Sequence, residues 1–174
     1  VDIVNIQQGH NVAWFEVFNE DEDEYSNNEA AYAAIHNAAA AAIKATDPTV
    51  KVAGGAWTQP FAGDIPAFVT NLDNNAVDAF TYHQYATGDS NLPLQDIYDR
   101  TVNLVGGSQS ARSDVDLAGR SNLPVFLGET NMYWSFNLDT QRYQSGVESA
   151  IFDALLMKAM AEDGEADAII AWNE

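Results

Sequence analysis

Four short groups of polar and aromatic residues each follow a run of apolar residues, and their types could carry out acid–base chemistry. The groups are Asn19-Glu20, His83 with Tyr85, Glu129 with Asn131, and Trp172 with Asn173-Glu174. If Glu20 and Glu129 face one cleft, one carboxyl group can be held protonated while the other stays ionised. Cleavage of a glycosidic bond needs that division of roles, because one group protonates the leaving oxygen and the other attacks or activates water.

Aromatic residues near these groups could hold a sugar. Trp57 and Trp134 directly follow predicted strands, and flat aromatic faces suit the apolar faces of sugar rings. As loop residues they could equally cover the rim of the scaffold, and the sequence leaves both interpretations open.

The scaffold must bring the ends of several strands together. Apolar runs predict strands over 12–18, 50–53, 77–82, 124–128 and 167–172, and helical spacing predicts helices over 29–45, 64–72, 94–105 and 143–161. Residues 106–122 have weak periodicity and are predicted to form a loop or a frayed helix. Alternation of this kind predicts a parallel α/β sheet whose strand ends carry the site. An open doubly wound sheet and part of a (β/α)8 barrel both fit.

Two of the helices have predicted inward faces. In the alanine-rich helix 29–45, the apolar spacing points to Tyr32, Ile35 and Ile43. In helix 143–161, it points to Val147, Ile151, Leu155 and Met160.

Composition excludes several classes of protein. The 174 residues, 47% of them hydrophobic, suffice for the core of one domain. Lys and Arg number 7 against 26 Asp and Glu, and the net charge of −19 argues against binding to nucleic acid or to an anionic membrane surface. It indicates an acidic, solubilising surface of the kind adapted to high salt. The sequence has no Cys, which excludes Cys-ligated metal sites, and no apolar run as long as a membrane span.

Other polar residues have plainer interpretations. The acidic run 20–24 lacks the spacing of an EF-hand and is predicted to be a solvated loop. His10 and His36 are predicted to be structural or exposed, and with His83 they are too scattered to indicate zinc. We therefore expect neither a metal site nor a cofactor.

Four segments together resemble a known group of enzymes. WFEVFNE (14–20), VDAFTYHQY (77–85), LPVFLGETN (123–131) and AIIAWNE (168–174) are similar to the fourth, sixth, seventh and eighth strands of the clan A (β/α)8-barrel glycoside hydrolases. The nearest resemblance within the clan is to the β-xylosidases and related enzymes. The chain accordingly looks like about five strands and four helices of a (β/α)8 barrel.

The resemblance implies a retaining β-glycoside hydrolase that acts on a poly- or oligosaccharide. Glu20 would be the general acid/base and Glu129 the nucleophile, with Glu174 a much weaker candidate for the acid. The other implied roles are contact with the sugar 2-hydroxyl by Asn19, support of the nucleophile in its ionised form by Tyr85, lining of that subsite by His83 and Asn131, and a sugar platform at Trp172.

The sequence also departs from the clan, because nothing corresponds to the first three strands or the final helix. Residues 1–174 are therefore expected to be the C-terminal part of one catalytic barrel, without a second domain, whose remainder lies in sequence outside this chain. The first residue is Val1 rather than Met, which fits a piece of a longer chain or a processed product. A polysaccharide substrate would suit a secreted or periplasmic enzyme. Two alternatives are a carbohydrate-binding barrel without turnover and a calcium- or other metal-dependent module built on the acidic run.

Overall fold

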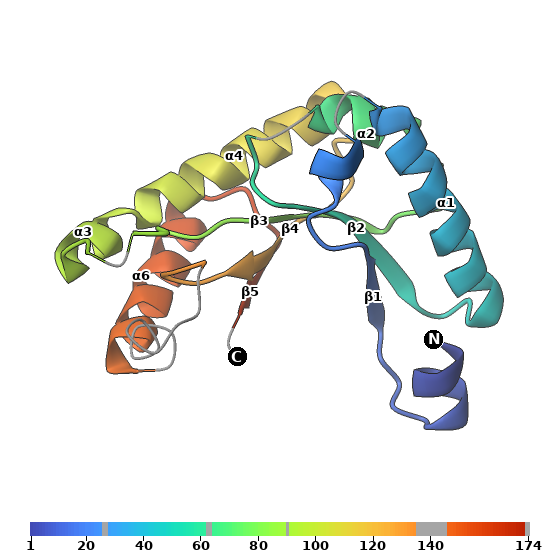
Figure 1. Cartoon of the computed structure of the whole chain (residues 1–174), viewed down its shortest axis with the longest axis horizontal. Helices are drawn as coiled ribbons and strands as arrows, with labels where there is room; N and C mark the ends of the chain where they lie inside the picture. Colours follow the sequence, from blue (N-terminus) through green and yellow to red (C-terminus); the bar gives the residue numbers. More distant parts are fainter. Residues whose placement is uncertain (26–27, 62–63, 90, 135–145, 173–174) are drawn as a thin grey trace. The chain divides into compact units, whose positions relative to one another are not determined.

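The computed structural model describes residues 1–25, 28–61, 64–89, 91–134 and 146–172 (Figure 1). The chain forms two compact units. The first unit comprises Val1–Thr58, Ala62–Thr81 and Asp114–Pro124, and the second comprises Gln59–Phe61, Tyr82–Ser113 and Val125–Glu174. Five strands are hydrogen-bonded in the order β1-β2-β3-β4-β5. Strand β3 (Ala79–His83) contributes residues to both units.

The first unit is built on a parallel pair of strands. Besides the first residues of β3, the elements of this unit are η1 (Asp2–Gln7), β1 (Trp14–Val17), η2 (Glu22–Tyr25), α1 (Glu29–Thr46), β2 (Lys51–Trp57) and α2 (Ile65–Asn71). Strands β1 and β2 pair in parallel, with Trp14 beside Lys51 and Val17 beside Gly54. Helix α1 runs alongside this pair (Figure 1). Val17, Ala40 and Val52 form part of the core between them.

Helix α1 begins and ends close to the predicted positions, and its predicted inward face is confirmed for Tyr32 and Ile43, which packs against the core, but is wrong for Ile35. Tyr32, His36 and Ala40 are fully buried, whereas Ile35 is 43% exposed. The spacing of four residues places one turn above the next on the same face. The packing explains the choice of residues, because a Cβ on Gly54 of β2 would lie 1.7 Å from Nε2 of His36. The imidazole therefore needs a glycine opposite it.

The second unit contains the C-terminal strands. Its elements are the end of β3, α3 (Leu94–Asp99), most of α4 (Thr101–Leu117), β4 (Val125–Thr130), α6 (Val147–Asp163) and β5 (Ala168–Ala171). Strands β4 and β5 pair in parallel, with Phe126 beside Ala168. Parallel pairing in both units agrees with the predicted sheet.

Helix α4 corrects the prediction for residues 106–122, which were expected to form a loop or a frayed helix. The segment is helical as far as Leu117. Its buried residues include Leu104, Ser108, Ala111 and Val115, which follow a helical spacing. Two of the four are small, so the stripe has little hydrophobicity and is hard to detect in the sequence.

Helix α6 corrects a second prediction. Phe152, Leu156 and Met160 are buried, whereas Val147 and Ile151 are 70% and 45% exposed. Apolar residues lie on both faces of this helix, so spacing alone could select the wrong one. Of the predicted inward residues only Met160 is buried, and the first predicted residues, 143–145, lie outside the described ones.

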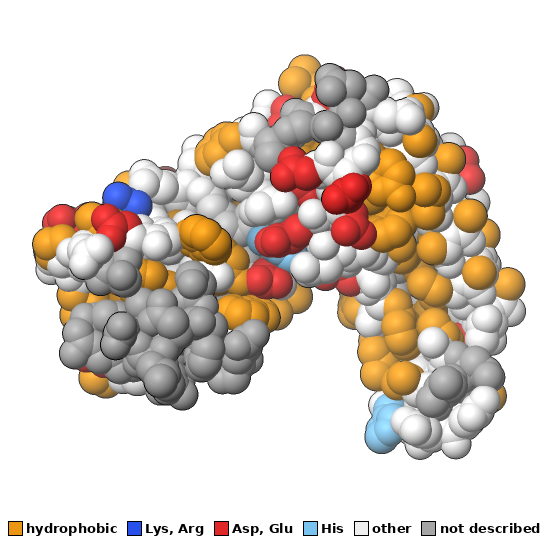
Figure 2. Space-filling view, in the orientation of Figure 1, with side chains coloured by type: hydrophobic (Ala, Val, Ile, Leu, Met, Phe, Trp, Pro, Cys, Tyr) orange, Lys and Arg blue, Asp and Glu red, His pale blue; other side chains and the backbone are white. Residues whose placement is uncertain are grey.

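Surface charge follows the composition. The face shown in Figure 2 carries many acidic side chains and few basic ones. Within the residues given above, no helix combines the length and the apolar character needed to cross a membrane.

Candidate active site

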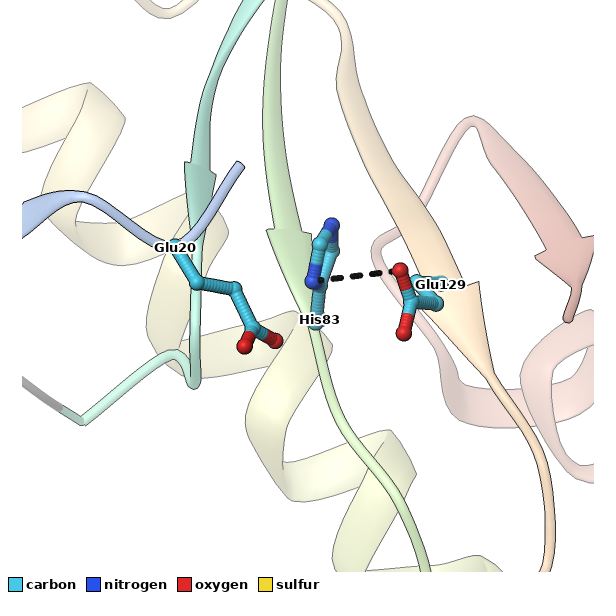
Figure 3. Close-up of side chains that lie close together, drawn as sticks. All are labelled: Glu20, His83 and Glu129. Atoms are coloured by element: carbon cyan, nitrogen blue, oxygen red, sulfur yellow. Dashed lines mark ion pairs between the residues drawn. The ribbon is translucent and has the colours of Figure 1, made fainter. Parts of the chain in front are cut away.

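Glu129 lies in β4 of the second unit, and two side chains from the end of β3 flank its carboxylate. The Tyr85 hydroxyl donates a hydrogen bond to Oε1 of Glu129. Nδ1 of His83 lies 3.6 Å from Oε2, an ion pair when the imidazole is protonated (Figure 3). His83 is buried, while the side chain of Glu129 is 20% exposed. The carboxylate is thus held on one side and open on the other.

The main chain after β3 explains why Tyr85 meets Glu129. Gln84 N–H donates to the carbonyl of Glu129 at 3.0 Å, and Ala86 N–H donates to the carbonyl of Asn131 at 3.2 Å. Side chains alternate along an extended segment, so Tyr85, between these two donors, is fixed relative to β4. The sequence prediction of a His-x-Tyr group at a strand end agrees with this geometry.

Trp172 is fixed beside the same strand. Its main-chain N–H donates to the carbonyl of Thr130 at 2.9 Å. Its ring meets the ring of Tyr85 edge-on, with the two centroids 6.2 Å apart. Asn131 is only 1% exposed, and its Nδ2 donates to the carbonyl of Trp172 at 2.7 Å while its Oδ1 accepts from Met132 N–H. Asn131 therefore ties β4 to the end of β5, and this burial argues against its predicted contact with substrate.

The two tryptophans predicted to lie in loops, Trp57 and Trp134, have different surroundings. Trp134 is 63% exposed, and a Cβ on Gly88 would lie 1.7 Å from its Nε1, so the indole rests directly on that glycine. Trp57 is fully buried against Tyr32 and Phe68, with centroids 5.5 and 5.0 Å away. The prediction of a platform at Trp57 is wrong because a ring packed inside the core has no face to offer.

Asn19 and Glu20 follow β1 in the first unit, in an unusual backbone conformation. Phe18 and Glu20 have φ of +70° and +59°, which places them in the left-handed region that residues other than glycine rarely adopt. Glu20 N–H donates to the carbonyl of Ala56 at 2.9 Å, and Ala56 also has a positive φ of +41°. Strained residues of this kind persist where surrounding contacts hold them, and they gather at functional sites.

Glu20 and Glu129 belong to different units, and their meeting in one cleft stays a prediction. Glu174, the weaker acid candidate, lies outside the described residues. Glu22 is not among the site residues predicted from the sequence. It is 5% exposed, and its Oε1 accepts from Thr58 N–H at 2.7 Å. No local signal distinguishes it from the other acids of the run 20–24, because its partner lies far along the chain.

Comparison with known proteins gives no match in sequence and clear matches in fold. No protein-family profile and no curated protein match the sequence. A GH39 β-xylosidase from Caulobacter crescentus is similar with a TM-score of 0.67 and 21% identity, over 98% of this chain and 35% of that enzyme. A glycoside hydrolase family 44 endoglucanase from Clostridium acetobutylium reaches 0.70 at 10% identity, over 99% of this chain and 45% of that enzyme. An α-L-arabinofuranosidase from Thermotoga maritima reaches 0.56 at 18% identity, over 96% and 37%.

These likenesses show the fold. The chain has the fold of part of a (β/α)8 barrel, which confirms the predicted architecture and, at the level of fold, the resemblance to the clan A enzymes. It spans less than half of the length of each of these enzymes.

Proposed function

We propose that this chain carries the catalytic carboxyl groups of a retaining β-glycoside hydrolase that acts on a neutral poly- or oligosaccharide. The observation that carries the proposal is the setting of Glu129, whose carboxylate is oriented by the Tyr85 hydroxyl and lies beside His83 at the end of a parallel strand. In (β/α)8 barrels the active site lies at the carboxyl ends of the strands. The strained turn that ends in Glu20 likewise follows the carboxyl end of a strand, β1.

The proposed reaction proceeds in two displacements. Glu129 attacks the anomeric carbon as the glycosidic C–O bond breaks, and Glu20 gives its proton to the leaving oxygen. Water then attacks the anomeric carbon of the glycosyl–Glu129 ester and loses a proton to Glu20, so that both residues return to their initial states. Asn19 would form a hydrogen bond with the 2-hydroxyl of the sugar, while Trp172 and the exposed Trp134 would provide flat faces on which sugar rings stack.

The test compares Glu129→Gln with Glu20→Gln on two β-glycosides of the same sugar that differ in the leaving group, and it is repeated with xylosides and with glucosides. One substrate carries a dinitrophenol leaving group and the other an alkyl or phenyl group. We expect Glu129→Gln to lower turnover of both by about 10⁴-fold or more because the attacking atom is lost. Glu20→Gln should slow the first step about 10²- to 10⁴-fold only for the poor leaving group, since dinitrophenolate departs without a proton.

Glu162→Gln serves as the control, because this residue forms an exposed ion pair with Lys158 on α6. A double Glu20/Glu129 variant that still releases reducing ends would overturn the proposal. Saccharide affinity that survives both replacements, with no turnover in the unaltered chain, would instead support a carbohydrate-binding barrel.

A further inference from the structure

The turn that carries Glu20 is held by contacts within the first unit, and one of them comes from an acid that the proposed reaction does not use. Phe18 and Glu20 both lie in the left-handed region. Each such residue costs about 1–3 kcal/mol and persists only where its neighbours fix it. The question is therefore which contacts fix this turn.

The turn is fastened to the end of β2. Glu20 N–H donates to the carbonyl of Ala56 at 2.9 Å. Two residues further along each segment, Oε1 of Glu22 accepts from Thr58 N–H at 2.7 Å. The two bonds lie on either side of Asp21, so the segment from Glu20 to Glu22 is tied to residues 56–58 at both of its ends.

The end of β2 is itself held in place. The Tyr32 hydroxyl of α1 donates to the carbonyl of Gly55 at 2.9 Å, and Ala56 N–H donates to Oγ1 of Thr81 at 2.9 Å. Burial, followed by the nearby Glu22 and Asp21 carboxylates, raises the pKa of Tyr32 well above its usual range. Tyr32 therefore remains a protonated donor at any pH at which the protein would work.

Glu22 is an unusual choice for a purely structural acceptor. It is 95% buried, and its Oε2 is enclosed without a hydrogen-bond partner among the described residues. Burying a carboxylate with one oxygen unsatisfied costs free energy. The bond from Thr58 N–H to Oε1 is the contact that offsets part of this cost, and it depends on the reach of the side chain to that amide.

We propose that Glu22 is a positioning residue, which fastens the Asn19–Glu20 turn to the end of β2 and so fixes the carboxyl group of Glu20 for proton transfer. The inference rests on the proposed function, because it assigns Glu20 a proton to deliver. Glu22 acts through the main chain and touches no substrate.

Three replacements separate reach from charge. Glu22→Gln keeps the acceptor oxygen at the same distance and removes the charge, so it should stay within about 3-fold of the unaltered protein. Glu22→Asp keeps the charge but is one methylene too short, and Glu22→Ala removes the acceptor. A displacement of about 1 Å at a reacting group can cost about 10²-fold. We therefore expect the Asp and Ala variants to lose roughly 10- to 100-fold on the alkyl or phenyl glycoside.

The leaving group separates positioning from general damage. On the dinitrophenyl glycoside, whose departure needs no acid, the Asp and Ala variants should lose less than about 3-fold in the glycosylation step. Hydrogen exchange provides a second readout, since the Glu20 amide should lose protection in Glu22→Asp and Glu22→Ala. Glu24→Ala is the matched control, because Glu24 lies exposed on the same short helix.

Equal losses on both glycosides, failure of Glu22→Gln to retain activity, or unchanged exchange at Glu20 would each overturn the positioning role. If Glu22→Ala does not fold, the Asp and Gln pair decides the question by the same criteria. If the full protein that carries this chain cleaves neither glycoside, the proposed function and the catalytic part of this inference both fall. The exchange measurement then still decides whether Glu22 holds the turn.

Discussion

The surroundings of Glu20 in the first unit and of Glu129 in the second fix a carboxyl residue in two different ways. Glu129 lies in a regular strand, and the Tyr85 hydroxyl orients its carboxylate directly. Glu20 lies in a strained turn that is fastened through its main-chain N–H to Ala56.

The difference matches the two proposed roles. A nucleophile has to remain ionised and aimed, and a hydroxyl donor binds the ionised carboxylate best. An acid/base changes its charge twice in each cycle. Fastening such a residue through its main chain gives an anchor that does not depend on that charge.

The largest expected effect is a loss of folding stability in acid, which arises from His36 in the first unit, the unit that carries Glu20. The ring of His36 lies 6.4 Å from that of Phe18 and edge-on to that of Phe68, fully buried. Burial lowers its pKa from 6.5 to about 4, only partly opposed by a backbone group of Ala53. Between these values the unfolded chain binds more protons than the folded one, so stability falls as the pH falls through this interval and is insensitive to His36 above it.

The resulting loss in unfolding free energy is roughly 3 kcal/mol and is complete below pH 4. Urea unfolding from pH 8 to pH 4 should therefore give a steeper decline for the unaltered chain than for His36→Leu. Parallel curves for the two proteins would show that His36 does not titrate on unfolding.

Tyr85→Phe tests the Glu129 side. A hydrogen bond to a charged group contributes about 1.5–3 kcal/mol, so we expect kcat on an aryl glycoside to fall roughly 10- to 100-fold. Tyr98→Phe is a suitable control, since its hydroxyl donates to the carbonyl of Glu148 at 3.2 Å, and it should change kcat less than about 3-fold. An equal effect of the two replacements would remove the special role of Tyr85.

The same change of glycine to alanine should have unequal effects in the two units. Gly54→Ala drives a Cβ into the ring of His36, which is buried, and overpacking of a core costs about 1–3 kcal/mol. Gly88→Ala meets Trp134, which is 63% exposed and can turn toward solvent, so the loss in unfolding free energy should be below about 1 kcal/mol.

Thermal unfolding measures both variants. Combining Gly54→Ala with His36→Ala should restore part of the lost stability, because the colliding ring is gone. A Gly88→Ala protein as unstable as Gly54→Ala would contradict the contrast between a buried and an exposed neighbour.

Much of the fold could be predicted because local signals agree with the tertiary structure. Helix α2 starts at a predictable place, since the Asp64 side chain accepts from Ala67 N–H and a proline occupies the first turn. The strands are apolar runs, and Glu20 and Tyr85 follow two of them as expected from the sequence, whereas Glu129 lies within the last residues of β4.

The features that could not be predicted depend on partners far along the chain. Trp57 is an exposed-loop candidate by position, but the rings of Tyr32 and Phe68 enclose it. Glu22 lies in a run of charges that predicts a solvated loop, yet it is buried, and the N–H of Thr58, 36 residues away, donates a hydrogen bond to it. The left-handed Phe18 opposes its own local preference, so only its neighbours can specify it.

The two left-handed residues around Asn19 bear on how the segment that carries Glu20 could be moved between proteins. A loop whose shape is encoded by its own residues can be transplanted as a cassette. Here the geometry is set by Gly55, Ala56 and Thr58 of the neighbouring segment and by Tyr32 of α1. A chimeric barrel would have to receive β1, α1 and β2 as one block, which makes this trio the smallest unit of recombination on this side of the fold.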